Sequence, residues 1–138
     1  MTKSPRRILL LLATLALAKS IDAAAATVVK SSADQAQTGN HATNAFDADP
    51  ETRWAASGHG RWIQFELDRT IELSELRIGF HHGQRDYAFD IRLSNDGKAW
   101  SPPKKFQSSG NPEVIAYQFP KQKLRFGRIT VYGSDDSD

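Results

Sequence analysis

Residues 62–67 read WIQFEL, which places Ile63, Phe65 and Leu67 on one side of an extended chain and Gln64 and Glu66 on the other. A period of two with one apolar face is typical of a half-buried antiparallel strand. No window of helical length carries a 3.6-residue period. The sequence therefore predicts an all-β fold. The same alternation returns at residues 76–80, 89–93, 115–119 and 129–131.

Turn residues separate these stretches. Residues 58–60 read GHG, Pro102 and Pro103 are adjacent, and residues 95–97 read NDG between two of the apolar runs. Glycine takes a positive φ at little cost, so the NDG sequence predicts a tight turn. Several short strands at this spacing indicate a β-sandwich or barrel. A length of 138 residues, 39% of them hydrophobic, fits one such domain.

The N-terminus has the features of a secretory signal. Lys3, Arg6 and Arg7 precede an apolar run at residues 8–18, and small residues cluster at residues 23–26. The run is too short to cross a bilayer as a helix, although an uncleaved anchor is an alternative. We expect residues 1–26 to be a signal peptide and residues 27–138 to be a secreted or periplasmic domain.

The charge and the missing residue types exclude several functions. The whole chain has a formal charge of +2, from 18 basic and 16 acidic residues. Loss of residues 1–26 removes four of the basic and one of the acidic residues, which leaves 14 and 15 and a charge near −1. Nucleic-acid binding therefore lacks its electrostatic signature. Cysteine is absent, and so are HExxH, GxxxxGK[ST] and GxSxG motifs. A binding domain is favoured over an enzyme.

Residues 47–52, DADPET, form the most suggestive polar cluster. Asp47, Asp49 and Thr52 bring carboxylates, a hydroxyl and carbonyls into one tight loop, and Ca²⁺ prefers such hard oxygen ligands. The loop is not an EF-hand, because the turn glycine and the closing glutamate of that motif are missing. An ordinary Asx-turn is the alternative interpretation.

Five segments occur in order along residues 42–133: NAFDADPETRW (44–54), GRWIQFEL (60–67), LRIGF (76–80), RDYAFDIRLSNDGKAW (85–100) and FGRITV (126–131). Together they resemble the motifs of the discoidin domain, also called the coagulation factor 5/8 type C domain, whose bacterial relatives are the family 32 carbohydrate-binding modules. The resemblance implies an antiparallel jelly-roll β-sandwich of the galactose-binding-domain-like class, with a calcium loop and ligand-binding loops at one end.

The resemblance also implies a calcium shell. Its ligands map onto the carbonyl of Asn44, the carboxylate of Asp47, Asp49, and the carbonyl and hydroxyl of Thr52. Family members continue to a final strand whose glutamate completes this shell, whereas this sequence stops at Asp138. We therefore expect a sandwich without its final strand and a weakened calcium site. A truncated product, or a fragment of a larger polysaccharide-degrading enzyme, would account for the difference.

Arg85 is the first candidate for sugar binding, because its planar fork can hold two hydroxyls or a uronate carboxylate. An ion pair with Asp86 or Asp90 is the alternative. Trp54 and Trp100 are expected to be core anchors. Three histidines can donate hydrogen bonds to a sugar, and one tyrosine can stack on it: His59, His81, His82 and Tyr87. For each histidine, a solvated loop residue without a ligand is the alternative.

Residues 79–85, GFHHGQR, are similar to modules attached to alginate-degrading lyases. The preferred ligand is therefore an acidic, uronate-containing polysaccharide, followed by a galactose-type sugar. A protein- or lipid-binding discoidin adhesion domain is the alternative class. The loops consist mostly of Gly, His, Arg, Ser and Asn, which disfavours insertion into a membrane.

Overall fold

The computed structural model describes residues 7–15, 26–47, 49, 51–80, 86–108 and 114–134. Every strand pairing among them is antiparallel, which confirms the all-β prediction. None of the helical segments in these ranges is long and apolar enough to cross a membrane. The elements are β1 (Arg7–Leu15), β2 (Val28–Ala33), the 3₁₀ helix η2 (Ala42–Phe46), β3 (Trp54–Ser57), β4 (Arg61–Phe80), β5 (Tyr87–Ser94), β6 (Lys104–Gln107) and β7 (Ile115–Ser134).

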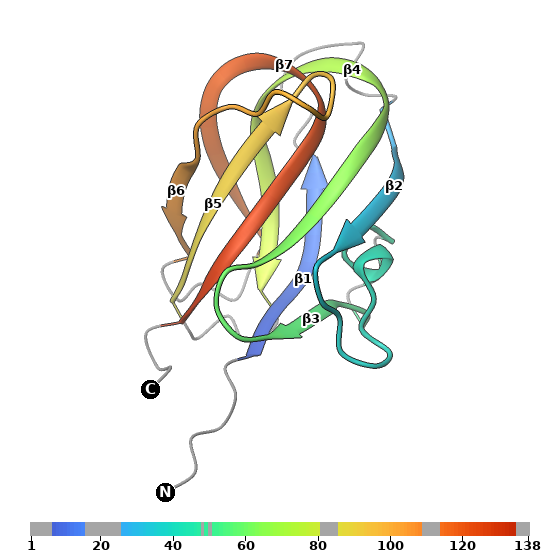
Figure 1. The fold of residues 1–138 in the computed structure, drawn as a ribbon, viewed down its shortest axis with the longest axis vertical. Helices are drawn as coiled ribbons and strands as arrows, with labels where there is room; N and C mark the ends of the chain where they lie inside the picture. The colour runs from blue at the N-terminus through green and yellow to red at the C-terminus, as the bar shows by residue number, and fades with distance from the viewer. Residues whose placement is uncertain are drawn as a thin grey trace, which may run out of the picture.

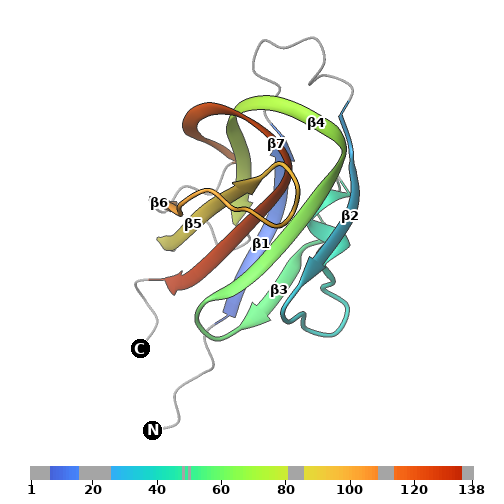
Figure 2. The ribbon, with the colours of Figure 1, turned by 45° about the horizontal axis from the view of Figure 1, so that its top comes forward.

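The sandwich is built around two strands of 20 residues, β4 and β7, which pair with each other and bend together (Figure 1). Their first and second halves lie in opposite layers, and the bend is visible at the top of the ribbon in both views (Figure 2). One layer has the order β2-β4-β7-β5-β6, and the other has the order β3-β1-β4-β7. The antiparallel sandwich predicted from the sequence is confirmed.

Strand β1 occupies the centre of the second layer. It pairs with β3 from Arg7↔Ser57 to Leu10↔Trp54 and with β4 from Leu10↔Phe80 to Leu15↔Leu76. These residues belong to the segment that the sequence assigns to a signal peptide. In this structure the N-terminal segment therefore supplies the strand that joins β3 to β4. Cleavage of that segment remains a prediction.

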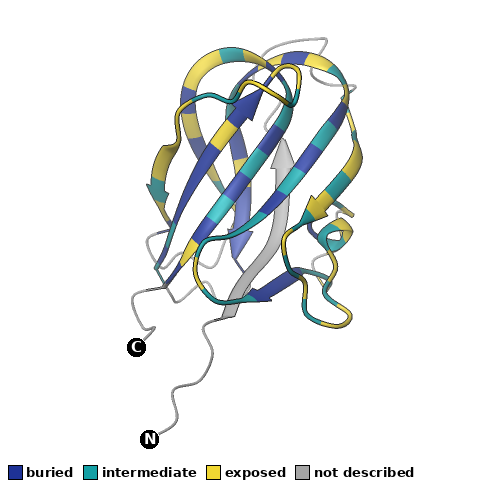
Figure 3. Cartoon of the chain, viewed as in Figure 1, coloured by how far each residue is buried: buried dark blue, intermediate teal, exposed yellow. Residues whose placement is uncertain are grey.

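The core lies between the two layers and follows the alternation read from the sequence. Buried and more exposed residues alternate as bands along β4 and β7 (Figure 3). Trp54 is fully buried, which confirms its role as a core anchor. The largest fully buried side chains are Trp54, Tyr87, Phe65, Phe89, Ile63, Leu67, Leu73, Leu76, Ile78 and Ile91.

The NDG sequence forms the tight turn that was predicted after β5. Gly97 has a φ of 77°, and its amide donates to Ser94 Oγ at 2.8 Å. Asp96 Oδ1 accepts the amides of Ala99 at 2.9 Å and Lys98 at 2.8 Å. These backbone donors, that of Ala99 foremost, lower the pKa of Asp96. The turn then returns the chain to pair Trp100 with Ser94.

Candidate functional site

The ends of several strands lie together at one end of the sandwich. Val131 in β7 pairs with Arg61, the first residue of β4, and Ser134 pairs with Tyr87, the first residue of β5. Phe80, the last residue of β4, lies at this end as well. It pairs with Leu10 of β1, and Leu10 pairs on its other side with Trp54 of β3. The connections after β3 and after β4 therefore begin and end at the same end of the molecule. This is where the sequence predicted the ligand-binding residues.

The structure describes two of the five predicted sugar-binding residues. His59 is exposed, between β3 and β4. Arg85, His81 and His82 lie outside the described residues. Tyr87 is fully buried, and its ring stacks on Phe80 with centroids 4.7 Å apart. This packing leaves no ring face of Tyr87 for a sugar.

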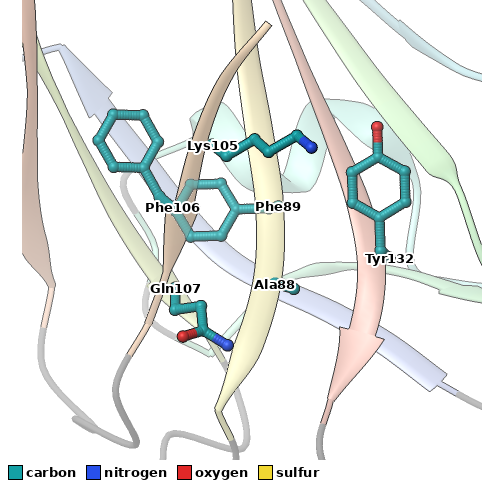
Figure 4. A pocket seen from close by; sticks show the side chains of 6 residues that line it. All are labelled: Ala88, Phe89, Lys105, Phe106, Gln107 and Tyr132. Atoms are coloured by element: carbon teal, nitrogen blue, oxygen red, sulfur yellow. The ribbon is translucent and has the colours of Figure 1, made fainter.

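Near this end, β5, β6 and β7 carry an open hollow of about 700 Å³ (Figure 4). The rings of Phe89 and Phe106, which lie opposite each other on β5 and β6, stack with centroids 5.6 Å apart and pack toward the core, and Phe89 is only 1% exposed. The Lys105 side chain extends toward the strand that carries Tyr132. The lining residues are Ala88, Phe89, Lys105, Phe106, Gln107 and Tyr132.

Tyr132 is the exposed aromatic of this hollow, with 40% of its surface accessible. Its hydroxyl donates a hydrogen bond to Asp90 Oδ2, and Asp90 itself is only 1% exposed. That hydrogen bond, together with burial, raises the pKa of the Tyr132 phenol. The tyrosine therefore stays neutral and is held by its hydroxyl while part of its ring faces solvent.

Lys105 and Gln107 provide polar groups for the hollow. Both are exposed on the edge strand β6, where Lys105 pairs with Asp90 and Gln107 with Ala88. Phe106 lies between them and packs against the core. Lys105, Gln107 and Tyr132 are not among the sugar-binding residues that the sequence predicts. For Tyr132 a signal existed, because the alternation of Ile129 and Val131 directs the residue after them outward.

A second polar cluster surrounds the hydroxyl of Thr52. Its Oγ1 lies 2.6 Å from Asp47 Oδ2, 3.1 Å from the carbonyl oxygen of Asp49 and 3.3 Å from that of Asn44. Oxygen atoms of the four predicted calcium ligands, Asn44, Asp47, Asp49 and Thr52, therefore lie close together. Within the described ranges no group of three or more His, Asp or Glu side chains could hold a metal. The cluster is instead a mixed set of hard oxygens, which fits Ca²⁺.

The backbone around the Thr52 cluster is held by hydrogen bonds. Asn44 Nδ2 donates to the carbonyls of Gly39 at 3.1 Å and Arg53 at 3.2 Å. The amide of Asp49 donates to Asp47 Oδ1 at 2.9 Å, an Asx-turn of the kind considered from the sequence. The Asx-turn interpretation is therefore confirmed, and calcium binding by the oxygens that this turn brings together stays a prediction.

On the outer side of β4 and β7, the guanidinium of Arg128 lies over two indole rings. Its Cζ is 4.4 Å from the ring centroid of Trp62 and 5.1 Å from that of Trp100. The Nε and Nη2 atoms both donate to Gln64 Oε1, at 2.9 and 2.7 Å. Trp100 is half-buried, so it is not the core anchor that the sequence predicted. It is a cation–π partner of Arg128 instead.

The comparisons with known proteins agree with this architecture. The sequence profile of the F5/8 type C domain matches residues 27–137. The chain belongs to the F5/8 type C domain family. A comparison with curated protein sequences gives no significant match.

Solved structures of carbohydrate-binding modules share the fold of this F5/8 type C domain. A pectin-binding module is 30% identical to this chain and superposes with a TM-score of 0.74. The match covers 82% of this chain and 84% of the module. The CBM32 of AlyQ in complex with 4,5-unsaturated mannuronic acid is 27% identical, with coverages of 80% and 86% and a TM-score of 0.73. A CBM32 module of Clostridium perfringens in complex with GalNAc-β-1,3-galactose, at 16% identity, coverages of 78% and 86% and a TM-score of 0.66, shows the fold alone.

Proposed function

We propose that this F5/8 type C domain is a secreted, non-catalytic carbohydrate-binding module that captures an acidic, uronate-containing polysaccharide at the loop end of the sandwich. The observation that carries the proposal is the 30% identity, over more than four fifths of both chains, to a pectin-binding module. The AlyQ module, bound to an unsaturated uronic acid, supports the same ligand class at 27% identity.

The hollow beside this end has the chemistry that a uronate needs. The Lys105 ammonium supplies a positive charge for a carboxylate, and the Gln107 amide supplies donors and an acceptor for hydroxyls. The ring of Tyr132 offers an exposed aromatic face beside them. Arg85 and His59 remain the predicted contacts on the neighbouring loops.

Lys105 can be tested against a matched control on the same strand. Lys105→Gln removes the charge at the hollow, whereas Lys104→Gln removes an equal, exposed charge from a residue that lines a different pocket. Exposed ion pairs contribute about 0.2–1 kcal/mol, so we expect K105Q to weaken binding by about 1.5- to 5-fold. K104Q should change it by less. Equal effects of the two variants would contradict the site.

The ligand class is tested by titrating the protein calorimetrically with oligogalacturonate, oligomannuronate and a neutral galactan. We expect binding to the two acidic oligomers, weakened by added salt because exposed charges are screened. Arg85→Ala should weaken binding of the two acidic oligomers relative to the unmodified protein. Binding of the galactan alone would replace the acidic ligand by a galactose-type one. Binding of none of the three would argue against the function.

A catalytic domain accompanies the module in one related protein, since a truncated AlyQ contains both a CBM32 and an alginate lyase domain. This chain covers 29% of that protein. We propose that the present domain likewise binds a polysaccharide and does not cleave it. Retention of the oligomer without release of new reducing ends is the expected result, and sustained release from a purified preparation would indicate an enzyme.

We further propose that the oxygens of Asn44, Asp47, Asp49 and Thr52 hold a structural Ca²⁺. Thermal unfolding with calcium and with chelator tests this. Stabilisation of about 3 kcal/mol or less is expected at a 100-fold excess over Kd. Asp47→Asn should remove most of it. Identical melting temperatures with and without calcium would leave the loop an ordinary turn.

A further inference from the structure

Strand β1 has a neighbour on each side. Its backbone pairs with β3 at four register positions and with β4 at five, antiparallel to both. Leu10 takes part in both pairings, opposite Trp54 on one side and Phe80 on the other. β1 therefore links β3 to the rest of the sheet.

The other edge of β3 is already occupied. The carbonyl of Ala55 accepts the amide of Gln37 at 2.7 Å, and the amide of Ala55 donates to Asn40 at 3.2 Å. Successive residues of a strand direct their backbone groups to opposite edges. Trp54 and Ala56 therefore present their amides and carbonyls to β1, so β3 has one open edge when β1 is absent.

The second half of β4 is in the same situation. Its other edge pairs with β7, for example at Leu76↔Tyr117 and Ile78↔Ile115. Neighbouring strands lie about 4.8 Å apart, so β3 and β4 are about 10 Å apart across β1. Without β1, each of these strands would remain hydrogen-bonded along its far edge only. Their near edges would face each other unpaired, too far apart to form hydrogen bonds with each other.

The residues that border this gap are core residues. Trp54, Ala56 and Ile78 are fully buried, and Phe80 is 2% exposed. A strand in the gap must therefore carry no charge along its central residues. Residues 8–15, ILLLLATL, meet this requirement. The apolar region of a leader and a central strand of a sandwich need the same kind of residue.

We propose that the gap between β3 and β4 is a strand-acceptor site, and that Arg7–Leu15 of the same chain is the strand it accepts. The segment then has two roles: it is the predicted export signal, and it completes the sandwich in the uncleaved chain. Cleavage between residues 23 and 26 opens the site. This inference concerns how the domain is completed and does not depend on the proposed ligand.

A cross-link tests the assignment in the complete chain, produced without export so that residues 1–26 remain. Leu9 lies directly opposite Ala55. The use of both backbone groups of Ala55 on the other edge makes this a close, non-hydrogen-bonded pair, with Cα atoms about 4.5 Å apart, which suits a disulfide. The chain contains no cysteine, so the pair Leu9→Cys with Ala55→Cys gives one unambiguous bridge.

We expect an intramolecular disulfide in the L9C/A55C chain, identified by mass spectrometry. The control pairs Leu9→Cys with Gln107→Cys on the far edge strand β6, and should oxidise at least tenfold more slowly. A bridge between two chains would assign the site to a second copy and overturn the proposal. Oxidation no faster than in the control would also overturn it.

A second measurement covers the case in which the cysteine variants fold poorly. Hydrogen exchange in the unmodified complete chain should show protected amides at Trp54 and Ala56. Leu10→Pro removes a backbone donor from β1 and should speed their exchange at least tenfold. Amides of Asp90 and Ile91, in the opposite layer, serve as the internal control. Exchange at Trp54 and Ala56 that the proline leaves unchanged would overturn the proposal.

Discussion

Gly127 offers a steric test of the sandwich, because its replacement by alanine places an atom where a ring already lies. A Cβ at this position would be 2.3 Å from Cζ and 2.5 Å from Cε1 of Phe65. Ordinary contact begins near 3.4 Å, so the ring must move by about 1 Å or the strands must separate. Phe65 lies directly opposite Gly127 in the β4–β7 pairing and is 1% exposed.

The cost of Gly127→Ala follows from this crowding. Adding a methyl group to a packed core costs about 1–3 kcal/mol, and a rigid buried ring places this site near the upper end. With a urea m-value of about 2 kcal/mol/M, the midpoint should fall by about 1 M or more. The ring of Phe65 also packs on Phe46, at 5.6 Å between centroids, and Phe46 precedes Asp47. If the Thr52 cluster holds Ca²⁺ as proposed, the substitution should also weaken the stabilisation that calcium gives.

A double-mutant cycle separates this clash from a general loss of stability. Phe65→Leu removes ring atoms and by itself should destabilise the protein by about 1–2 kcal/mol. In the G127A background the same change relieves the clash, so the double variant should be more stable than the sum of the two effects by at least about 1 kcal/mol. Urea unfolding of the four proteins measures this. A stability of G127A within about 0.5 kcal/mol of the parent, or strict additivity, would refute the reasoning.

Three further changes have expected outcomes. The pKa of Asp96 lies below 3.8 in the folded state, so the stability that its carboxylate contributes is complete above pH 3.8 and is lost as the pH falls through the folded-state pKa. Asp96→Asn should therefore make the free energy of unfolding depend less on pH in acid, which unfolding measured between about pH 5 and 2 would reveal. Arg128→Lys loses the fork on Gln64 and should cost about 1 kcal/mol with altered tryptophan fluorescence, whereas the exposed Arg92→Lys should cost less than 0.5. Residues 27–138 alone should melt lower than the complete chain or self-associate, because an open strand edge binds other strands; light scattering and calorimetry would detect either.

The sequence predicted those strands in which apolar and polar residues alternate, because one face of each is buried. It could not show that the segments at 62–67 and 76–80 belong to one strand, β4, or that those at 115–119 and 129–131 belong to one strand, β7. The pairing of β4 with β7 is interrupted between Glu66 and Ile71, where residues 68–70 read DRT, so the sequence pattern resembles a loop between two strands. β3 reads WAAS and is buried at three consecutive residues, which erases the alternation. β6 has only four residues, too few for a period to emerge.

The candidate site was predictable only where local chemistry determines it. The oxygens of Asn44, Asp47 and Thr52 lie within one loop, so a short stretch of sequence brings them together. Lys105 and Tyr132 come from strands that are joined only through β5, and their proximity follows from sheet order. Tyr87 shows the reverse error, since its burial depends on Phe80, which packs on its ring.

The strand-acceptor gap and the ligand-binding end share a structural element, which couples the two proposals physically. Phe80 ends β4, pairs with Leu10 of β1 and stacks on Tyr87, where β5 begins. The connection between Phe80 and Tyr87 contains Arg85, the first predicted sugar contact. If β1 leaves the gap, Phe80 loses its backbone partner, and Tyr87 at the start of β5 stacks on a ring that is no longer held by a paired strand. If the ligand binds at this end as proposed, we expect its affinity to depend on occupancy of the gap even though the ligand and β1 need not touch.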